Sequence, residues 1–355
     1  MGEVPRGSLS TGADDDESLD DRVKSRRDIA AQCIYGVDRD PLALEMAKLS
    51  LWLVTLARTQ PFAFVDHALK CGDSLLGVSS LDQLRRMNLG SERHSQLSFG
   101  GTQVTNWSAE ASGSFRETVD RSLAEAARSR RLLGSIGSDK SIQDIHLKSS
   151  LLTSADEATG RLRVVADALT ATSLVATGRG QHWQEATSRL LTHVARMDED
   201  VHLSLLEDAG DSSVGPDRST FFHWPLEFPE VFERQAGGFD GFLANPPFVG
   251  AKPLSKAVGA STVTFWRQYW DVSGMVNLAS LFLRRIAELM SDSGCFGLIM
   301  TDQVRVGASK EAGQVTGLEP GLAPEPEQVS QVTLEGTRIC AVLPSWASRK
   351  DISRL

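Results

Sequence analysis

The chain has 355 residues, of which 41% are hydrophobic and 23% charged, typical of a globular protein with one large domain or two ordinary ones. No apolar run approaches the roughly 20 residues that span a bilayer, and the N-terminus lacks a signal-peptide pattern, which predicts a cytoplasmic protein without membrane contact. The net charge of −9 argues against a protein that binds a nucleic-acid backbone over its whole surface, although a local basic groove is compatible with it.

Residues 1–28 have acidic and small side chains without an apolar period, which predicts a flexible leader. Residues 29–78 form the first α/β part. A short apolar run over 33–37 predicts a buried strand, and Asp40 and Pro41 predict the cap and first turn of a helix. A second apolar strand is expected over 68–71, which completes a βαβ unit. The helix has apolar residues at helical spacing, for which we predict burial: Leu42, Met46, Leu49, Leu53 and Leu56.

Residues 79–219 change to long helical periods and predict a helical insertion within the α/β domain, for which a hairpin of long helices is one expected form. The expected buried stripes are Phe115, Val119 and Leu123, then Leu162, Val165 and Leu169, then Leu190, Val194, Met197 and Val201. A scaffold role is the preferred interpretation of this insertion. The alternative is a DNA-facing role for Arg128, Arg130 and Arg131.

Residues 220–302 return to the α/β pattern. A strand over 239–244 leads directly into Asn245, a helix follows over about 278–289, and a turn over 291–294 precedes a buried strand over 295–300. Residues 303–355 are rich in Gly, Pro, Glu and Gln, which predicts a poorly ordered tail with at most a short strand over 339–343.

The four cysteines, Cys33, Cys71, Cys295 and Cys340, lie far apart and form no CxxC pair. This spacing favours reduced, buried thiols over disulfides or a metal site, and no metal is expected.

The sequence Asn245-Pro246-Pro247-Phe248, directly after a predicted strand, is the most specific signal in the chain. The exocyclic amine of adenine is a poor nucleophile because its lone pair is delocalised into the ring. Two acceptors that take both amine hydrogens, here the Asn245 side-chain oxygen and the Pro246 carbonyl, free that lone pair for attack on a methyl sulfonium. The prolines hold the carbonyl in place, and Phe248 offers a flat face for a flipped-out base.

With this motif the sequence resembles the N6-adenine DNA methyltransferases, and more closely the branch allied to combined restriction-modification (type IIG-like) enzymes. The resemblance covers about residues 33–301 and includes Phe222-His223-Trp224-Pro225. It implies an incomplete doubly wound, Rossmann-like α/β domain that binds S-adenosyl-L-methionine. It also implies methyl transfer to N6 of a flipped adenine in double-stranded DNA, within a restriction-modification or phage-defence system.

Two acidic positions match the cofactor-binding elements of that family. Tyr35-Gly36-Val37-Asp38-Arg39-Asp40-Pro41 resembles the element in which an acid accepts both ribose hydroxyls, so Asp38 and its neighbour Arg39 are expected to bind the cofactor. Cys71-Gly72-Asp73-Ser74-Leu75-Leu76-Gly77 resembles the element in which an acid, here Asp73, accepts from the cofactor's adenine amine.

Two elements of the family are not evident. The strand and glycine-rich loop that cradle the methionine part of the cofactor should precede Ile34, and a final hairpin and target-recognition domain should follow Met300. Both ends therefore look truncated, and a partner chain or missing segments could supply the glycine loop and target recognition. Two alternatives remain: the same site acting on an RNA base or a glutamine side chain, and a degenerate fragment without independent activity.

Overall fold

A computed structural model describes most of the two predicted α/β parts and the helices between them. The residues it describes are 23, 25–55, 65–89, 109–136, 142–178, 221–235, 237–247, 249, 251–270, 272, 277–301, 330–334 and 337–342. The third predicted stripe of the insertion, Leu190 to Val201, lies outside these residues.

Helices predominate over strands in this part of the chain. The strands are β1 (Gly36–Asp38), β2 (Leu69–Cys71), β3 (Phe239–Ala244), β4 (Met290–Thr301), β5 (Ser330–Leu334) and β6 (Thr337–Val342). Residues 25–32 are helical, so the prediction of a flexible leader is wrong for 25–28. The labelled helices up to the return of the α/β pattern are α2 (Pro41–Val54), α3 (Leu81–Arg85), α5 (Ala109–Ser135) and α6 (Ile142–Gly178). The later helices are α9 (Trp224–Glu227), α10 (Pro229–Phe232), α11 (Ala251–Val258), α12 (Ala260–Tyr269) and α13 (Leu278–Leu289).

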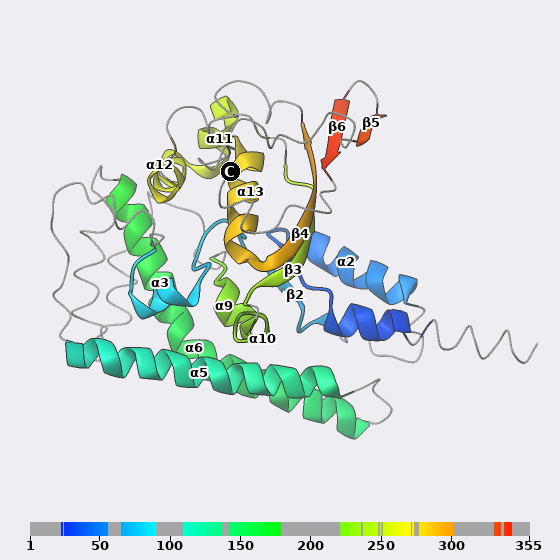
Figure 1. The fold of residues 1–355 in the computed structure, drawn as a ribbon, viewed down its shortest axis with the longest axis vertical. Helices are drawn as coiled ribbons and strands as arrows, with labels where there is room; N and C mark the ends of the chain where they lie inside the picture. The colour runs from blue at the N-terminus through cyan, green and yellow to red at the C-terminus, as the bar shows by residue number, and fades with distance from the viewer. Residues whose placement is uncertain are drawn as a thin grey trace, which may run out of the picture.

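The strands form two small sheets. In the first, β1 and β2 are parallel, with Asp38 opposite Cys71. In the second, the order is β3-β4-β6-β5: β3 and β4 are parallel, and the β5–β6 hairpin continues the sheet antiparallel to β4. Figure 1 shows α2 beside the strands, α13 along β4, and α5 along the base of the molecule, from which α6 rises toward α12.

Helix α2 begins as its sequence predicts. The Asp40 side chain accepts a hydrogen bond from the Leu42 amide, and Pro41 occupies the first turn, where a missing N–H costs nothing. The prediction of its buried face, however, is wrong. Leu42, Met46 and Leu53 are 70%, 55% and 57% exposed, Leu49 is exposed too, and Leu56 lies outside the described residues.

The face of α2 that does pack carries Leu44 and Leu51, which contact Val65 and Leu69 beneath the β1–β2 pair. Leu44 and Leu51 also lie at helical spacing, because the helix is apolar on more than one side. The sequence therefore offered two candidate faces, and only the neighbouring strands select between them.

Helices α5 and α6 form a long antiparallel hairpin whose inner residues are buried as their spacing predicts. Val119 and Leu123 of α5 and Leu162 and Leu169 of α6 belong to the same core as Leu75, from the loop after β2. The hairpin therefore shares one hydrophobic core with the α/β part.

A buried ion pair also fixes this hairpin. Arg130 of α5 makes bidentate contacts of 2.8–3.1 Å with Glu230 of α10, and both side chains are nearly inaccessible to solvent. Arg130 therefore cannot face DNA, whereas Arg128 and Arg131 are exposed. Burial of Arg130 favours the scaffold interpretation of the hairpin.

Strand β3 runs into Asn245 as predicted, and α13 spans the predicted helix. Strand β4 begins earlier than expected: residues 291–294, predicted as a turn, belong to it. Its pairing with β3 shifts register, from Phe239 opposite Met290 to Gly241 opposite Cys295. The predicted turn is thus an irregular stretch within β4, which has more residues between these two pairs than β3 has. Such extra residues on one strand are typical of a β-bulge.

The β5–β6 hairpin lies in the range predicted as a poorly ordered tail with at most one short strand. That prediction is wrong for 330–334 and 337–342, which pair with each other and, through β6, with β4. β-Branched residues such as Val332, Thr333 and Ile339 favour strands, but a polar, glycine- and proline-rich surrounding sequence hides this preference. A hairpin after β4 is also what the resemblance implied.

Three of the four cysteines are free but exposed, which corrects the prediction that they are buried. Cys71 ends β2 at an exposed position, and Cys295 follows the irregular stretch of β4, at an exposed position where the pairing with β3 resumes opposite Gly241. Within the described helices, none combines the length and the apolar character that crossing a membrane demands.

Candidate active site

Three of the predicted site residues lie at the carboxyl ends of parallel strands. Asp38 is the last residue of β1, Asp73 follows the end of β2 by two residues, and Asn245 comes directly after β3. In α/β proteins with parallel sheets, ligands bind beyond these strand ends. The positions of the three side chains are therefore those of a ligand site.

Asp38 is exposed at the end of β1. One oxygen of its carboxylate accepts from the Asp40 amide at 2.8 Å, and its backbone carbonyl accepts from the Gly72 amide at 2.9 Å. Since a carboxylate has about four lone-pair sites, the side chain retains capacity for the two hydroxyls of a ribose. The hydrogen bond from Gly72 ties the end of β1 to the turn after β2.

Asp73 is much less accessible than Asp38, with a side chain that is 12% exposed. Its Oδ1 accepts from the Leu75 amide at 3.0 Å, and Nη1 of Arg39 lies 3.8 Å from its Oδ2. Burial raises the pKa of Asp73, while the amides of Leu75 and Leu76 and the charges of Arg39 and Arg285 oppose that rise. Asp73 is thus oriented by the backbone and held near a positive charge, as an acceptor for an amine requires.

The segment Phe222–Trp224, which the resemblance included without a role, holds the loop after β2. The amides of Phe222 and Trp224 donate to the carbonyls of Leu76 and Val78 at 2.8 and 3.0 Å. Gly77 allows this approach: its φ is +131°, and a Cβ there would overlap the Phe222 carbonyl. The Phe222–Trp224 segment and the loop after β2, residues 72–79, therefore pack closely against each other.

His223 links this loop to the helical hairpin. Its Nδ1 accepts from the Val78 amide at 3.1 Å, so its Nε2 carries the hydrogen that it donates to Asp167 of α6 at 2.9 Å. His223 is buried. Both ring nitrogens of His223 are thus engaged within the fold, which favours a structural role for this residue over a catalytic one.

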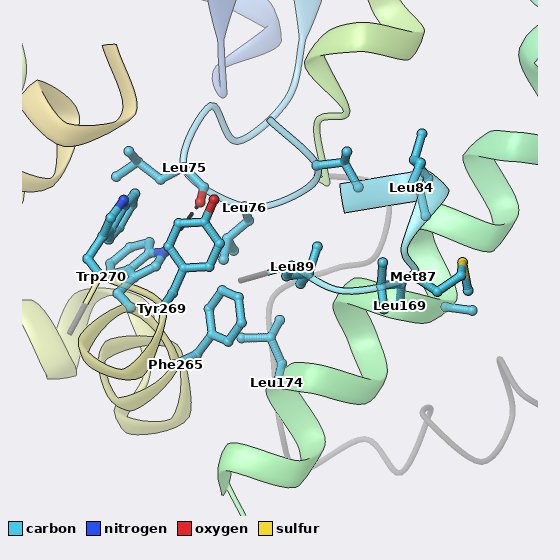
Figure 2. Close-up of a cluster of buried hydrophobic side chains, with 14 of the residues drawn as sticks. Leu75, Leu76, Leu84, Met87, Leu89, Leu169, Leu174, Phe265, Tyr269 and Trp270 are labelled. Atoms are coloured by element: carbon cyan, nitrogen blue, oxygen red, sulfur yellow. Dashed lines mark hydrogen bonds between the residues drawn. The ribbon is translucent and has the colours of Figure 1, made fainter. Parts of the chain in front are cut away.

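A second anchor of the loop was missed by sequence reasoning. Arg285 of α13 donates from Nη2 to the Leu75 carbonyl at 2.9 Å, and the Trp266 indole of α12 donates to the same oxygen at 3.4 Å. Figure 2 shows Tyr269, the last residue of α12, and Trp270, which follows it, beside Leu75 and Leu76. The available signal was an arginine at a buried position of the α13 stripe, since an unpaired charge there would be costly.

The Asn-Pro-Pro segment follows β3 and belongs to neither a helix nor a strand. Asn245 and Pro247 are exposed and Pro246 is buried, while Phe248 lies outside the described residues. The Val249 amide donates to the Pro247 carbonyl at 2.9 Å, and the Val249 carbonyl accepts from the Leu278 amide at 3.3 Å. The segment is thus attached to β3 at one end and to the start of α13 at the other.

Among the residues that the structure describes, no group of three or more His, Cys, Asp or Glu side chains could hold a metal ion. The described polar side chains at the strand ends are two carboxylates and one amide, with Arg39 beside them. These are hydrogen-bonding groups suited to a nucleoside and an amine.

Fold and site together define an α/β nucleotide-cofactor protein with a helical hairpin built into its core. Comparison with protein families is more specific: the model of the Eco57I restriction-modification methylase family matches residues 32–314. The chain belongs to this family. The comparisons with curated proteins and with solved structures found no match.

Membership identifies the activity that the motif predicted. The family comprises adenine DNA methyltransferases of restriction-modification systems, which use S-adenosyl-L-methionine as methyl donor. DNA as substrate is favoured over the RNA base and glutamine side chain that the motif alone left open. The family also implies a Rossmann-like fold, of which the described residues contain the small parallel pairs β1–β2 and β3–β4.

Proposed function

We propose that Asn245 and Pro246 are the acceptors that activate the N6 amine of an adenine flipped out of double-stranded DNA. The observation that carries this proposal is the place of Asn245 directly after a parallel strand, exposed, next to a buried proline. The Asn245 Oδ1 and the Pro246 carbonyl accept one amine hydrogen each, which returns electron density to the nitrogen. Pro247 restrains the backbone and Phe248 stacks on the base.

Asp38 and Asp73 hold the nucleoside end of S-adenosyl-L-methionine in this proposal. Asp38 accepts from the ribose hydroxyls and Asp73 from the adenine amine, while the charge of Arg39 opposes the rise in the pKa of Asp73 that burial causes. Carboxylates at the ends of two adjacent parallel strands are hydrogen-bond acceptors that fit the hydroxyls and the amine of a nucleoside. The cofactor supplies a methyl group on a sulfonium, and the amine proton leaves to solvent after transfer.

We further propose that the two sheets are parts of one doubly wound sheet that is interrupted between β1 and β3. Tyr35, directly before β1, contacts Phe239, the first residue of β3, with ring centroids 5.6 Å apart. Both residues pack with Phe228 and Trp224 in one cluster. In the described part of the chain, β1 pairs only with β2 and β3 only with β4, so each has an unpaired edge facing this region.

A further polypeptide segment, from outside the described residues or from a partner chain, is proposed to supply the glycine loop for the methionine end of the cofactor. The unpaired edge of β1 and the exposed apolar stripe of α2 support this, since a parallel sheet is ordinarily covered on both faces. The same two observations favour the second candidate: a chain that holds the nucleoside end but has no independent activity.

Calorimetric titration with S-adenosyl-L-methionine separates the two candidates. Micromolar binding by the chain alone contradicts the inactive-fragment hypothesis, and no binding contradicts autonomous catalysis. If binding is found, Asn245→Ala is expected to lower the methylation rate of DNA about 100-fold or more, with cofactor affinity nearly unchanged.

Thr264→Ala, on the exposed face of α12, is the matched control and should retain the wild-type rate. Loss of both rate and cofactor binding in Asn245→Ala would assign Asn245 to folding instead of catalysis.

A further inference from the structure

Helix α13 contacts both loops of the proposed site. We call residues 245–249 the target-base loop and residues 72–79 the cofactor loop. The amide of Leu278, its first residue, donates to the Val249 carbonyl of the target-base loop at 3.3 Å. The side chain of Arg285 donates to the Leu75 carbonyl of the cofactor loop at 2.9 Å. Positions seven apart lie on the same face of a helix, with an axial separation of about 10 Å. One rigid element therefore joins the two loops.

The backbone of Leu75 transmits this attachment to Asp73. Its N–H donates to the Asp73 carboxylate, and its C=O accepts from Arg285. These two groups belong to the peptides on either side of the Leu75 Cα, so a displacement of the carbonyl is carried through one residue to the hydrogen bond that orients Asp73. Arg285 contacts this backbone and does not touch the carboxylate.

Arg285 is itself held on several sides. It is 2% exposed, its Nη1 donates to Glu288 Oε2 at 2.7 Å, and its guanidinium lies 5.3 Å from the ring centroids of both Tyr269 and Trp270. Tyr269 and Trp270 donate to the two oxygens of Glu288 at 3.1 and 2.7 Å. The cluster leaves Arg285 little freedom to choose another position.

Tyr269 ties the cluster to the far end of the cofactor loop as well. The Gln83 side chain donates to the Tyr269 hydroxyl at 2.7 Å, and the Gln83 Oε1 accepts from the Ser79 amide at 2.8 Å. Tyr269 ends α12, which follows the target-base loop through α11. The cluster thus connects the loop that holds Asp73 with the helices that follow Asn245.

We infer that α13 sets the spacing between the cofactor's adenine and the target adenine, and that Arg285 is the positioning residue that fixes Asp73 to this helix. The inference rests on the proposed roles of Asp73 and Asn245. The positive charge of Arg285 also acts on Asp73, together with Arg39 and the amides of Leu75 and Leu76, against the rise in pKa that burial causes.

The test compares Arg285→Met, which removes the charge and the donors, with Arg285→Lys, which keeps the charge. Arg267→Met, on the exposed face of α12, is the control. Two readouts need no cofactor: amide hydrogen exchange at Leu75, and the pKa of Asp73 from a carboxyl carbon NMR titration. A third is the affinity for S-adenosyl-L-methionine.

In Arg285→Met we expect Leu75 exchange to accelerate about tenfold or more, beyond any change at amides of α6, and the pKa of Asp73 to rise further. In Arg285→Lys the pKa of Asp73 should stay near that of the wild type, because the charge remains. Cofactor affinity should fall about tenfold in Arg285→Met and stay unchanged in Arg267→Met.

The inference is overturned if Leu75 and α6 amides accelerate equally in Arg285→Met and Arg285→Lys, since Arg285 then acts only on global stability. An unchanged pKa of Asp73 in Arg285→Met also overturns it. A wild-type chain that binds no cofactor contradicts the proposed function instead, and the exchange and titration results still decide the role of Arg285.

Discussion

The loop Gly72–Ser79 and the β1–α2 unit both face the proposed cofactor site, but they differ in how completely they are packed. Carbonyls of the loop are bound by Phe222, Trp224 and Arg285. In the β1–α2 unit, one face of the helix packs on the strands and the other leaves Leu42 and Met46 in solvent. The loop that carries Asp73 is therefore held by described residues on several sides, whereas the β1–α2 unit that carries Asp38 is packed only on its inner face.

The largest effect is expected where the loop is anchored. Trp266→Ala removes a side chain that is 1% exposed and donates to the Leu75 carbonyl, and we expect a loss of about 3–5 kcal/mol in the free energy of unfolding. Leu243→Ala, at a position that is 89% exposed, should cost at most about 0.5 kcal/mol. Urea denaturation measures the free energy of unfolding of both variants. Equal losses would show that the contacts of the loop contribute no more to stability than an exposed side chain does.

Gly77→Ala tests the fit between the loop and the Phe222–Trp224 segment. The positive φ and the overlap with the Phe222 carbonyl predict a loss of about 3 kcal/mol. Gly160→Ala, in α6 with open space around it, should instead stabilise by about 0.5–1 kcal/mol. Thermal unfolding measures the melting temperatures of both variants, and a shift in the same direction for both would contradict this prediction.

The pH dependence of stability tests whether His67, which lies two residues before β2, is shielded from solvent in the folded chain. Its ring donates to the Ala31 carbonyl, and burial, with the charge of Arg130 as the next cause, lowers its pKa from 6.5 to about 4. Because the unfolded chain takes up the proton first, the stability is complete above about pH 6.5 and falls by about 2–3 kcal/mol as the pH drops to about 4.

In His67→Gln, which can keep the bond to Ala31, the part of the pH dependence between pH 6.5 and 4 that His67 causes should disappear. Denaturation midpoints measured across this range for both proteins provide the check. An identical slope in the variant would mean that His67 is accessible to protons in the folded chain.

The smallest effect is expected on the outer face of α2. Leu42→Ser and Met46→Gln should each change the free energy of unfolding of the chain alone by at most about 0.5 kcal/mol, because both side chains are exposed. Leu44→Ala, on the packed face, should cost about 2 kcal/mol or more. A large loss from the outer pair would reveal that the stripe is covered in solution.

Much of the site could be predicted because its signals are local. Asp40 and Pro41 predicted the start of α2, and a buried strand before Asn245 predicted β3. The order of Asp38, Asp73 and Asn245 along the chain led to the family that the comparison confirms. The catalytic and cofactor-binding roles of these residues stay predictions.

Arg285 and His223 could not be assigned in this way, because their partners lie far along the chain. Arg285 bonds a carbonyl 210 positions earlier, and His223 bonds an amide 145 positions earlier. A single sequence contains no local pattern for such pairs. The packed face of α2 was missed for a related reason: the helix is apolar on two sides, and spacing alone does not rank them.

The sequence by itself determined the elements and the chemistry at their ends, because caps, apolar periods and the Asn-Pro-Pro-Phe motif act over a few residues. Only the tertiary structure decided which faces are buried and which loops are joined. It placed the backbone of Leu75 between Asp73 and Arg285, and it left the outer stripe of α2 without a described partner. The physical reason is that burial and long-range hydrogen bonds depend on neighbours that the chain brings together only on folding.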